Sequence, residues 1–304
     1  MDQANGELRQ GAAARAFRLL MAAGLLVTLA ANVPGHLSLD SVVALTEARS
    51  NVRQTWAPAV SSWLMKPFDF FVPGTGLYIA ASSALLFLSL MTLPRLRGRA
   101  TWLGVLIGLL VLATPQVLIY QGIVWRDVIF ANLTIAGFVC LAQAAKAWGG
   151  RTPIAPLAGA LVCLALAALV RQNGLILLVA GAVSLAWMAR GGGRKRALAW
   201  GLGGLVLAGL LALAFDHLSQ PATIPPKLRL RSATLILQHY DIIGAKAHHP
   251  RLKFKDIETA NPASAALLER DAGLRYSASR VDTLDYDDAF RQALWHLPDP
   301  VMNA

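Results

Sequence analysis

Residues 100–125 read ATWLGVLIGLLVLATPQVLIYQGIVW, which is 26 positions without one Asp, Glu, Lys or Arg. A helix that crosses the hydrocarbon core of a membrane needs about 20 mostly apolar residues, because each residue adds about 1.5 Å of length. This stretch is long enough, and Leu, Val, Ile and Gly dominate it. It predicts a membrane-spanning helix.

Six further stretches lack charged residues in the same way: 19–39, 70–94, 128–145, 152–170, 172–189 and 197–215. The core of a soluble helical protein rarely supplies seven such stretches in succession. Of the 304 residues, 15% are charged and 56% are hydrophobic, whereas about 25% are charged in ordinary soluble domains. These values exclude an ordinary cytoplasmic enzyme and a disordered regulator. We expect an all-α integral membrane protein with seven transmembrane helices.

Basic residues are divided unevenly between the segments that join these stretches. With the N-terminus inside, the inner segments hold 12 Lys and Arg residues, and the short outer segments hold 5. Cytoplasmic loops carry the excess of Lys and Arg in membrane proteins. The pattern predicts a multi-pass protein of a bacterial inner (plasma) membrane with a cytoplasmic N-terminus and a periplasmic C-terminus. It also accounts for the net charge of +11, so we expect no nucleic-acid partner.

Composition divides the chain into three parts. Residues 1–18 form a cytoplasmic tail, residues 19–215 the membrane domain, and residues 216–304 an extracytoplasmic segment of ordinary polarity. The first apolar stretch would also suit a secretory signal, but the six stretches that follow favour an uncleaved helix. In the outer loop 34–73, apolar residues recur at helical spacing from near Asp40 and again after Pro58. This predicts two helices in the membrane–water interface.

The acidic residues of the membrane domain gather on the outer side. The expected topology places four of them there together with two arginines: Asp40, Glu47, Asp69, Asp127, Arg126 and Arg171. Charged groups at a membrane boundary are functional candidates, because withdrawing them from water is costly unless they have a partner. The asymmetry predicts a polar site at the outer face.

Structural roles are alternatives at each of these positions. Asp40 and Asp127 could instead cap the helices that they precede. Arg126 and Arg171 could simply extend to the water boundary, and Arg171 also suits a helix C-terminus. The other two acidic residues are interpreted as solvated positions.

Three short motifs stand at the outer ends of the expected helices. Residues 34–41 read PGHLSLDS, residues 123–128 read IVWRDV, and residues 170–174 read VRQNG. In their order and position they resemble the membrane glycosyltransferases of the GT-C superfamily, and more specifically a bacterial group of uncharacterised GT-C-like proteins. The resemblance covers about residues 16–250.

The resemblance implies transfer of a sugar from a polyprenyl-phosphate carrier to a cell-envelope acceptor. Asp40 would be the catalytic general base, and Arg126 and Arg171 would bind the donor phosphate. Asp127 would orient Arg126 or the acceptor, and Asn173 would hydrogen-bond a sugar hydroxyl. The implied partners are membrane lipid, a polyprenyl-phosphate-linked sugar donor and an envelope glycan or lipid acceptor.

The chain departs from the family in two places. Residues 56–59 read WAPA where related proteins often carry a His-Pro-Pro element, and we keep Trp56 as a substrate-binding candidate. The sequence ends at Ala304, whereas related proteins return to the membrane, so we expect a shortened chain. The alternative to an enzyme is a non-catalytic membrane protein, either a degenerate glycosyltransferase scaffold or a small-solute transporter.

The sequence contains no metal-binding motif. Cys140 and Cys163 fall inside expected membrane helices and are interpreted as packing residues, and no paired Cys or His spacing occurs. No cofactor is assigned, and a divalent cation stays open as a candidate.

Overall fold

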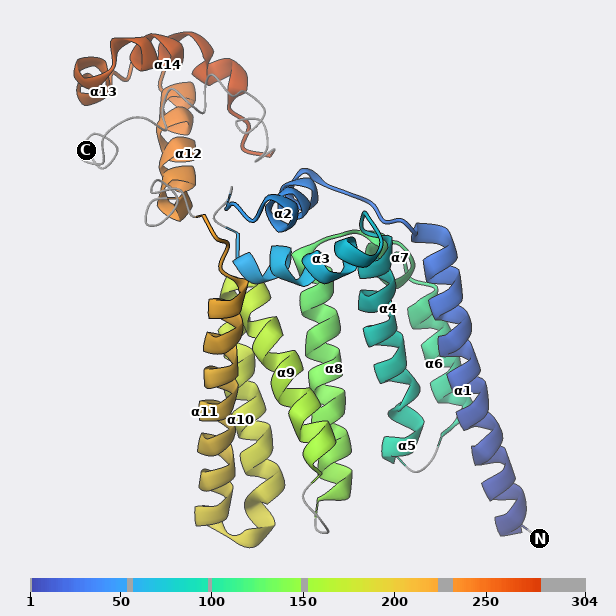
Figure 1. Cartoon of the computed structure of the whole chain (residues 1–304). Coiled ribbons are helices and arrows are strands. Elements are labelled where there is room, and N and C mark those ends of the chain that lie inside the picture. Colours follow the sequence, from blue (N-terminus) through green and yellow to red (C-terminus); the bar gives the residue numbers. More distant parts are fainter. Residues whose placement is uncertain (1, 54–56, 98–99, 149–152, 224–231, 280–304) are drawn as a thin grey trace. The chain divides into compact units, whose positions relative to one another are not determined.

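The computed structural model describes residues 2–53, 57–97, 100–148, 153–223 and 232–279 (Figure 1). These residues form helices joined by short turns, and no β-strand occurs among them. The expected all-helical class is therefore confirmed. The chain divides into two compact units, Met1–Thr223 and Ile224–Ala304.

The first unit is a bundle of apolar helices with two helices across one end (Figure 1). Its helices are α1 (Asp2–Asn32), α2 (Leu39–Ser50), α3 (Ala59–Phe71), α4 (Gly76–Met91), α5 (Leu93–Arg97), α6 (Trp102–Leu112), α7 (Pro115–Leu118), α8 (Arg126–Ala147), α9 (Ile154–Val170), α10 (Ile176–Ala189) and α11 (Arg194–Ser219). Short 3-10 turns are η1 (Tyr120–Gly122), η2 (Gln172–Leu175) and η3 (Arg190–Gly192). Within the bundle, helix α8 contacts α4 and α9, and helix α9 contacts α10 and α11.

Five helical segments are long and apolar enough to cross a membrane: Gly11–Asn32, Gly76–Leu96, Arg126–Ala147, Asn173–Gly192 and Arg194–Ser219. The bent pair of α6 with Pro115–Gly122 adds a sixth if it is one span, and α9 is a shorter apolar helix of 17 residues. The described residues thus supply five or six candidate spans, where the sequence predicts seven. Leu and Val side chains cover the exposed faces of α6 and α11, as contact with lipid requires. The chain is a multi-pass helical membrane protein by these criteria.

The stretch 100–125 is not the single continuous helix that its composition predicts. Helix α6 ends at Leu112, and the chain resumes helical structure at Pro115 after a bend of 66°. Proline has no backbone N–H and disfavours helical backbone at the preceding residue, here Thr114. The proline therefore breaks the helix, and η1 then leads toward α8.

Helices α2 and α3 occur where the outer loop predicts them. Helix α2 begins at Leu39, and α3 begins directly after Pro58. Leu45 of α2 and Val60 of α3 belong to one buried cluster that also contains Ile79 of α4 and residues of α8 and α9. Each buried aliphatic side chain contributes about 1.5–3 kcal/mol of stabilisation. This shared core attaches both helices to the end of the bundle.

The second unit contains α12 (Ser232–His248), α13 (Lys255–Ala260) and α14 (Pro262–Arg275). Ile243, Ile257 and Leu268 form its small apolar core. The Lys246 side chain is 4% exposed, and its ammonium donates to Glu269 Oε1 at 2.5 Å and to two backbone carbonyls of the segment after α12.

Candidate functional site

The segment between α1 and α2 is joined to the segment that precedes α8. The His36 N–H donates to the Gly122 carbonyl at 2.7 Å, and the Val124 N–H donates to the His36 carbonyl at 3.1 Å. Nearby, Thr75 Oγ1 donates to the Pro34 carbonyl at 2.8 Å. Two stretches that are 86 residues apart in sequence thus become neighbours, and the PGHLSLDS and IVWRDV motifs meet.

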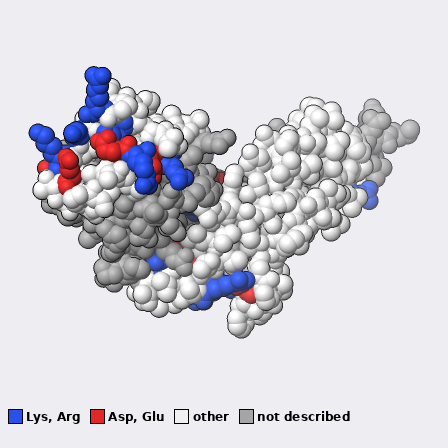
Figure 2. All heavy atoms as spheres, turned by 90° about the horizontal axis from the view of Figure 1, so that it is seen from above, with Lys and Arg blue, Asp and Glu red and all other residues white. Residues whose placement is uncertain are grey.

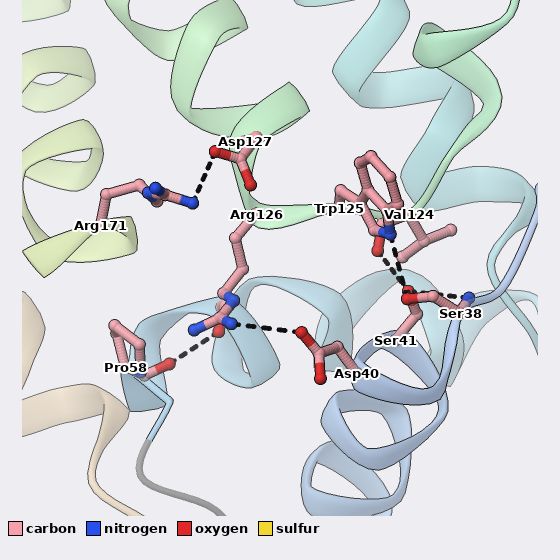
Figure 3. A network of polar contacts seen from close by, with 10 residues as sticks. Ser38, Asp40, Ser41, Pro58, Val124, Trp125, Arg126, Asp127 and Arg171 are labelled. Atoms are coloured by element: carbon pink, nitrogen blue, oxygen red, sulfur yellow. Dashed lines mark hydrogen bonds and ion pairs between the residues drawn. The ribbon is translucent and has the colours of Figure 1, made fainter. Parts of the chain in front are cut away.

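The N-terminus of α2 is anchored on this same segment (Figure 3). Ser41 Oγ donates to the Val124 carbonyl at 2.5 Å, and Trp125 Nε1 donates to Ser38 Oγ at 3.0 Å. Ser38 is the N-cap residue of α2, and its N–H donates to Ser41 Oγ at 3.3 Å. The interpretation of Asp40 as a helix cap is therefore wrong, because Asp40 lies in the first turn instead.

Asp127 is likewise not a cap, because Trp125 is the N-cap residue of α8 and Asp127 lies in its first turn. Arg171 is the C-cap residue of α9, in agreement with the expectation that it suits a helix C-terminus. The partial positive charge at a helix N-terminus stabilises carboxylates in the first turn. Both carboxylates thus lie in the first turn of a helix without capping it.

Four of the predicted site residues form two ion pairs at the end of the bundle that α2 and α3 cover. Arg126 Nη2 lies 3.4 Å from Asp40 Oδ2, and Arg171 Nη1 lies 2.6 Å from Asp127 Oδ1. The residues come from α2, α8 and the end of α9, and Arg126 and Asp127 are consecutive in the chain. Figure 3 shows the two ion pairs close to each other. Pro58, the N-cap residue of α3, lies beside Arg126. We call these four residues the ion-pair cluster.

The two carboxylates of the ion-pair cluster are open to solvent, whereas the arginines are more enclosed. The side chains of Asp40 and Asp127 are 75% and 59% exposed, and those of Arg126 and Arg171 are 24% and 39% exposed. An anion that approaches from outside could take the place of either carboxylate on its arginine. Arginine binds phosphate through two parallel hydrogen bonds, so the cluster has the groups that a phosphate requires.

No family model, curated protein or solved structure matches the chain. The function must therefore be argued from the chemistry of the residues that the fold brings together.

Asn173 lies beside the ion-pair cluster in sequence but is not joined to it by a hydrogen bond. Asn173 is exposed and lies in η2, the short turn that follows Arg171. The next residue, Gly174, lies so close to α9 that a Cβ atom there would be 2.7 Å from the Ala167 carbonyl. The glycine therefore allows the VRQNG turn to fold tightly against α9. Trp56 lies outside the described residues.

The other two acidic residues are not the solvated positions that the sequence predicts. Asp69 accepts hydrogen bonds from Arg49 Nε at 2.9 Å, Arg49 Nη2 at 2.7 Å and the Gly74 N–H at 2.7 Å. The Arg49 hydrogen bond holds the pKa of Asp69 below its usual value, against a smaller opposing effect of burial. This pair links α2 to the end of α3.

Glu47 is 6% exposed and accepts a hydrogen bond from Ser62 Oγ of α3 at 2.7 Å. The sequence analysis missed it as a buried group. The spacing gives no signal for this burial, because Glu47 follows Asp40 by seven residues and so lies on nearly the same helix face as an exposed acid.

Charged side chains occupy a small part of the surface seen in Figure 2, and acidic and basic residues lie next to one another there.

Within the described ranges, no group of three or more His, Cys, Asp or Glu residues is placed to hold a metal ion. Cys140 and Cys163 are free, half-buried thiols on α8 and α9.

Proposed function

We propose that this chain is a membrane glycosyltransferase of the GT-C type. It moves a sugar from a polyprenyl-phosphate-linked donor to a cell-envelope acceptor on the periplasmic face. One observation carries the proposal: Asp40, Arg126, Asp127 and Arg171 come from separate segments and gather at one end of the bundle as two ion pairs. These residues belong to the motifs on which the family resemblance rests.

The proposed donor site uses the two arginines as phosphate ligands. Departure of the lipid phosphate increases negative charge on its oxygens, and fixed cations in a poorly hydrated site stabilise that charge. Arg126 holds Asp40 at 3.4 Å, which is longer than a strong charge-assisted hydrogen bond. A phosphate would therefore compete well for this guanidinium and release the carboxylate.

Asp40 is the proposed general base. Its carboxylate takes the proton of an acceptor hydroxyl while the acceptor oxygen forms a bond to the anomeric carbon of the sugar. The bond between that carbon and the phosphate oxygen breaks, and the lipid phosphate leaves with the electron pair. The 75% exposure of the Asp40 side chain supports this role, because an acceptor can reach it from the aqueous side.

The proposed topology has seven spans, with the N-terminus in the cytoplasm of a bacterium. Helix α9 completes the count, because its 17 apolar residues rise about 25 Å and it packs against α8 and α11. The excess of Lys and Arg at the opposite end from the ion-pair cluster supports this orientation. The placement of ionisable groups at helix ends supports an interfacial enzyme over a transporter, whose charged sites lie near the membrane midplane.

The test measures binding of polyprenyl phosphate to the purified full chain in nanodiscs. Arg126→Ala and Arg171→Ala should each weaken binding at least about tenfold, because each removes charged hydrogen bonds to phosphate. Arg49→Ala is the matched control, since Arg49 is an outer-face arginine that pairs with Asp69 outside the cluster. Equal binding by wild type and both cluster variants would refute the donor site.

A second experiment separates catalysis from donor binding. Asp40→Asn keeps the size of the side chain but removes the basic carboxylate. It should bind polyprenyl phosphate at least as tightly as wild type does, because no carboxylate then competes for Arg126, and it should slow sugar transfer by about 100-fold or more, which is the usual contribution of a general base. Wild-type transfer rates in Asp40→Asn would show that another group takes the proton.

A further inference from the structure

A second polar site lies in the first unit, between α2, α3 and the end of α11. It is a cavity of about 350 Å³, which is near the lower end of the usual size range for small-molecule sites. Its lining includes Glu47 of α2 and Ser62, Trp63 and Lys66 of α3. The ion-pair cluster does not contribute to it.

The cavity contains a buried carboxylate whose position is fixed. Glu47 is 6% exposed and accepts a hydrogen bond from Ser62 Oγ at 2.7 Å, and Ser62 is equally buried. A carboxylate withdrawn from water is stabilised by hydrogen-bond donors, so ligand hydroxyls would be favourable partners here. Its oxygens accept hydrogen bonds, which suits a ligand rich in hydroxyl groups.

Helix α3 also contributes an aromatic ring and a cation to the lining. The Trp63 ring packs against Phe215 of α11 at 6.3 Å between centroids, so its orientation is fixed. Lys66 follows Ser62 by one helical turn, is exposed, and forms no ion pair within the part of the chain that the structure describes. An indole presents a flat apolar face to a sugar ring, and the ammonium favours a negatively charged substituent.

We propose that this cavity binds an acidic sugar residue of the acceptor, that is, a ring with several hydroxyls and one carboxylate or phosphate group. The hydroxyls donate to Glu47, one ring face packs on Trp63, and the acidic group pairs with Lys66. The assignment to the acceptor rests on the proposed glycosyltransferase function.

The spacing of the two sites indicates the length of that acceptor. Asp40 and Glu47 lie on nearly the same face of α2, about two turns or on the order of 10 Å apart. This rise along the helix exceeds the width of one sugar ring. An acceptor held at Glu47 and deprotonated at Asp40 is therefore best matched by an oligosaccharide, with its acidic residue away from the end that receives the new sugar.

The experiment measures binding of a saccharide panel to the purified full chain by calorimetry. The panel holds uronic-acid oligosaccharides and phosphorylated oligosaccharides, each beside its neutral counterpart. Wild type should prefer one acidic class over its neutral counterparts, and that class identifies the acidic group. Lys66→Gln should weaken acidic ligands by roughly fivefold, as expected for an exposed ion pair, and should change neutral ones by less than twofold.

Two further variants separate the cavity from general effects of charge. Glu47→Gln should weaken acidic and neutral ligands alike by about tenfold, because hydroxyls lose a charged acceptor. Lys195→Gln changes an exposed lysine in the first turn of α11, outside the cavity, and should leave all binding unchanged. The cavity assignment is refuted if no acidic saccharide binds better than its neutral counterpart, or if Lys66→Gln and Lys195→Gln behave alike.

Donor binding is measured on the same samples, so that failure of one proposal does not imply failure of the other. Lys66→Gln should bind polyprenyl phosphate as wild type does, because Arg126 and Arg171 are unchanged. Saccharide binding without any binding of polyprenyl phosphate would leave the cavity a saccharide site and would overturn the glycosyltransferase proposal. Polyprenyl-phosphate binding without a preference for acidic saccharides would overturn the cavity proposal alone.

Discussion

A pair of amide side chains buried in the bundle provides a quantitative test of how the fold is held together. Asn132 of α8 is fully buried, and Gln121 of η1 is 7% exposed. Asn132 Nδ2 donates to Gln121 Oε1 at 2.9 Å, and Gln121 Nε2 donates to Asn132 Oδ1 at 3.1 Å. Asn132 Nδ2 also lies 2.9 Å from Ser82 Oγ of α4. One residue thus joins three segments.

Replacing Asn132 by Leu keeps a similar volume but leaves both polar ends of the Gln121 amide without this partner. An unsatisfied buried polar group costs about 1–3 kcal/mol in proteins generally, whereas measured side-chain hydrogen bonds in membranes average about 0.6 kcal/mol. With two reciprocal bonds lost, we expect Asn132→Leu to lower the free energy of unfolding by about 1–3 kcal/mol. Gln121→Leu should have a similar effect, for the same reason.

The double variant decides whether the amide pairing is the cause. When both partners are apolar, no amide of this pair is left unsatisfied, so the loss in Asn132→Leu/Gln121→Leu should be smaller than the sum of the single losses by about 1–2 kcal/mol. Unfolding free energies come from SDS titration in mixed micelles. Thr134→Val is the control, because the Thr134 hydroxyl donates within its own helix, to the Phe130 carbonyl. Additive single losses would refute the reasoning.

Three further predictions concern packing, pH and topology. Gly122→Ala should lower the melting midpoint by several degrees, because the new Cβ would lie 2.2 Å from Asn32 Oδ1 and overpacking costs about 1–3 kcal/mol. An unchanged midpoint would contradict this and would mean that Asn32 can move away from the new methyl group. Since Arg49 lowers the pKa of Asp69, the stability that this carboxylate contributes is present at neutral pH and is lost as pH falls through the lowered pKa, below the ordinary 3.8. The difference in melting midpoint between wild type and Asp69→Asn should therefore vanish at lower pH, and a constant difference would contradict this. In intact cells an impermeant maleimide should not label Gly191→Cys until the membrane is opened, and labelling beforehand would reverse the topology.

The positions of most helices in the bundle could be predicted because the signal is local. A run of apolar residues without charge must avoid water wherever it lies, so its composition alone indicates a helix in a membrane. The same argument failed at Pro115, where one residue breaks an apolar run that otherwise looks continuous. Pro115 is present in the sequence, but the length of the apolar run favoured the prediction of one continuous helix.

The candidate site was predicted in part for a different reason. Membrane topology alone brings residues at helix ends to one face, so it could gather Asp40, Arg126 and Arg171 there without specifying contacts. It could not specify that Arg126 pairs with Asp40 while Arg171 pairs with Asp127. Nor could it predict the burial of Glu47, because burial of a polar helix face depends on which helix covers it. That helix is α3, which supplies Ser62.

The amide pair and the ion-pair cluster are connected through two hydrogen-bonded contacts and the short backbone segments between them, which has a consequence for function. Asn132 holds η1 through Gln121, and the last residue of η1, Gly122, accepts the His36 N–H that positions the loop before α2. Asp40 lies at the start of that helix. A change at Asn132 should therefore weaken polyprenyl-phosphate binding as well as stability. Arg126→Ala, by contrast, should weaken binding with little loss of stability, because exposed ion pairs contribute at most about 1 kcal/mol. Neutral amides inside the bundle thus hold the charged groups at its end in register.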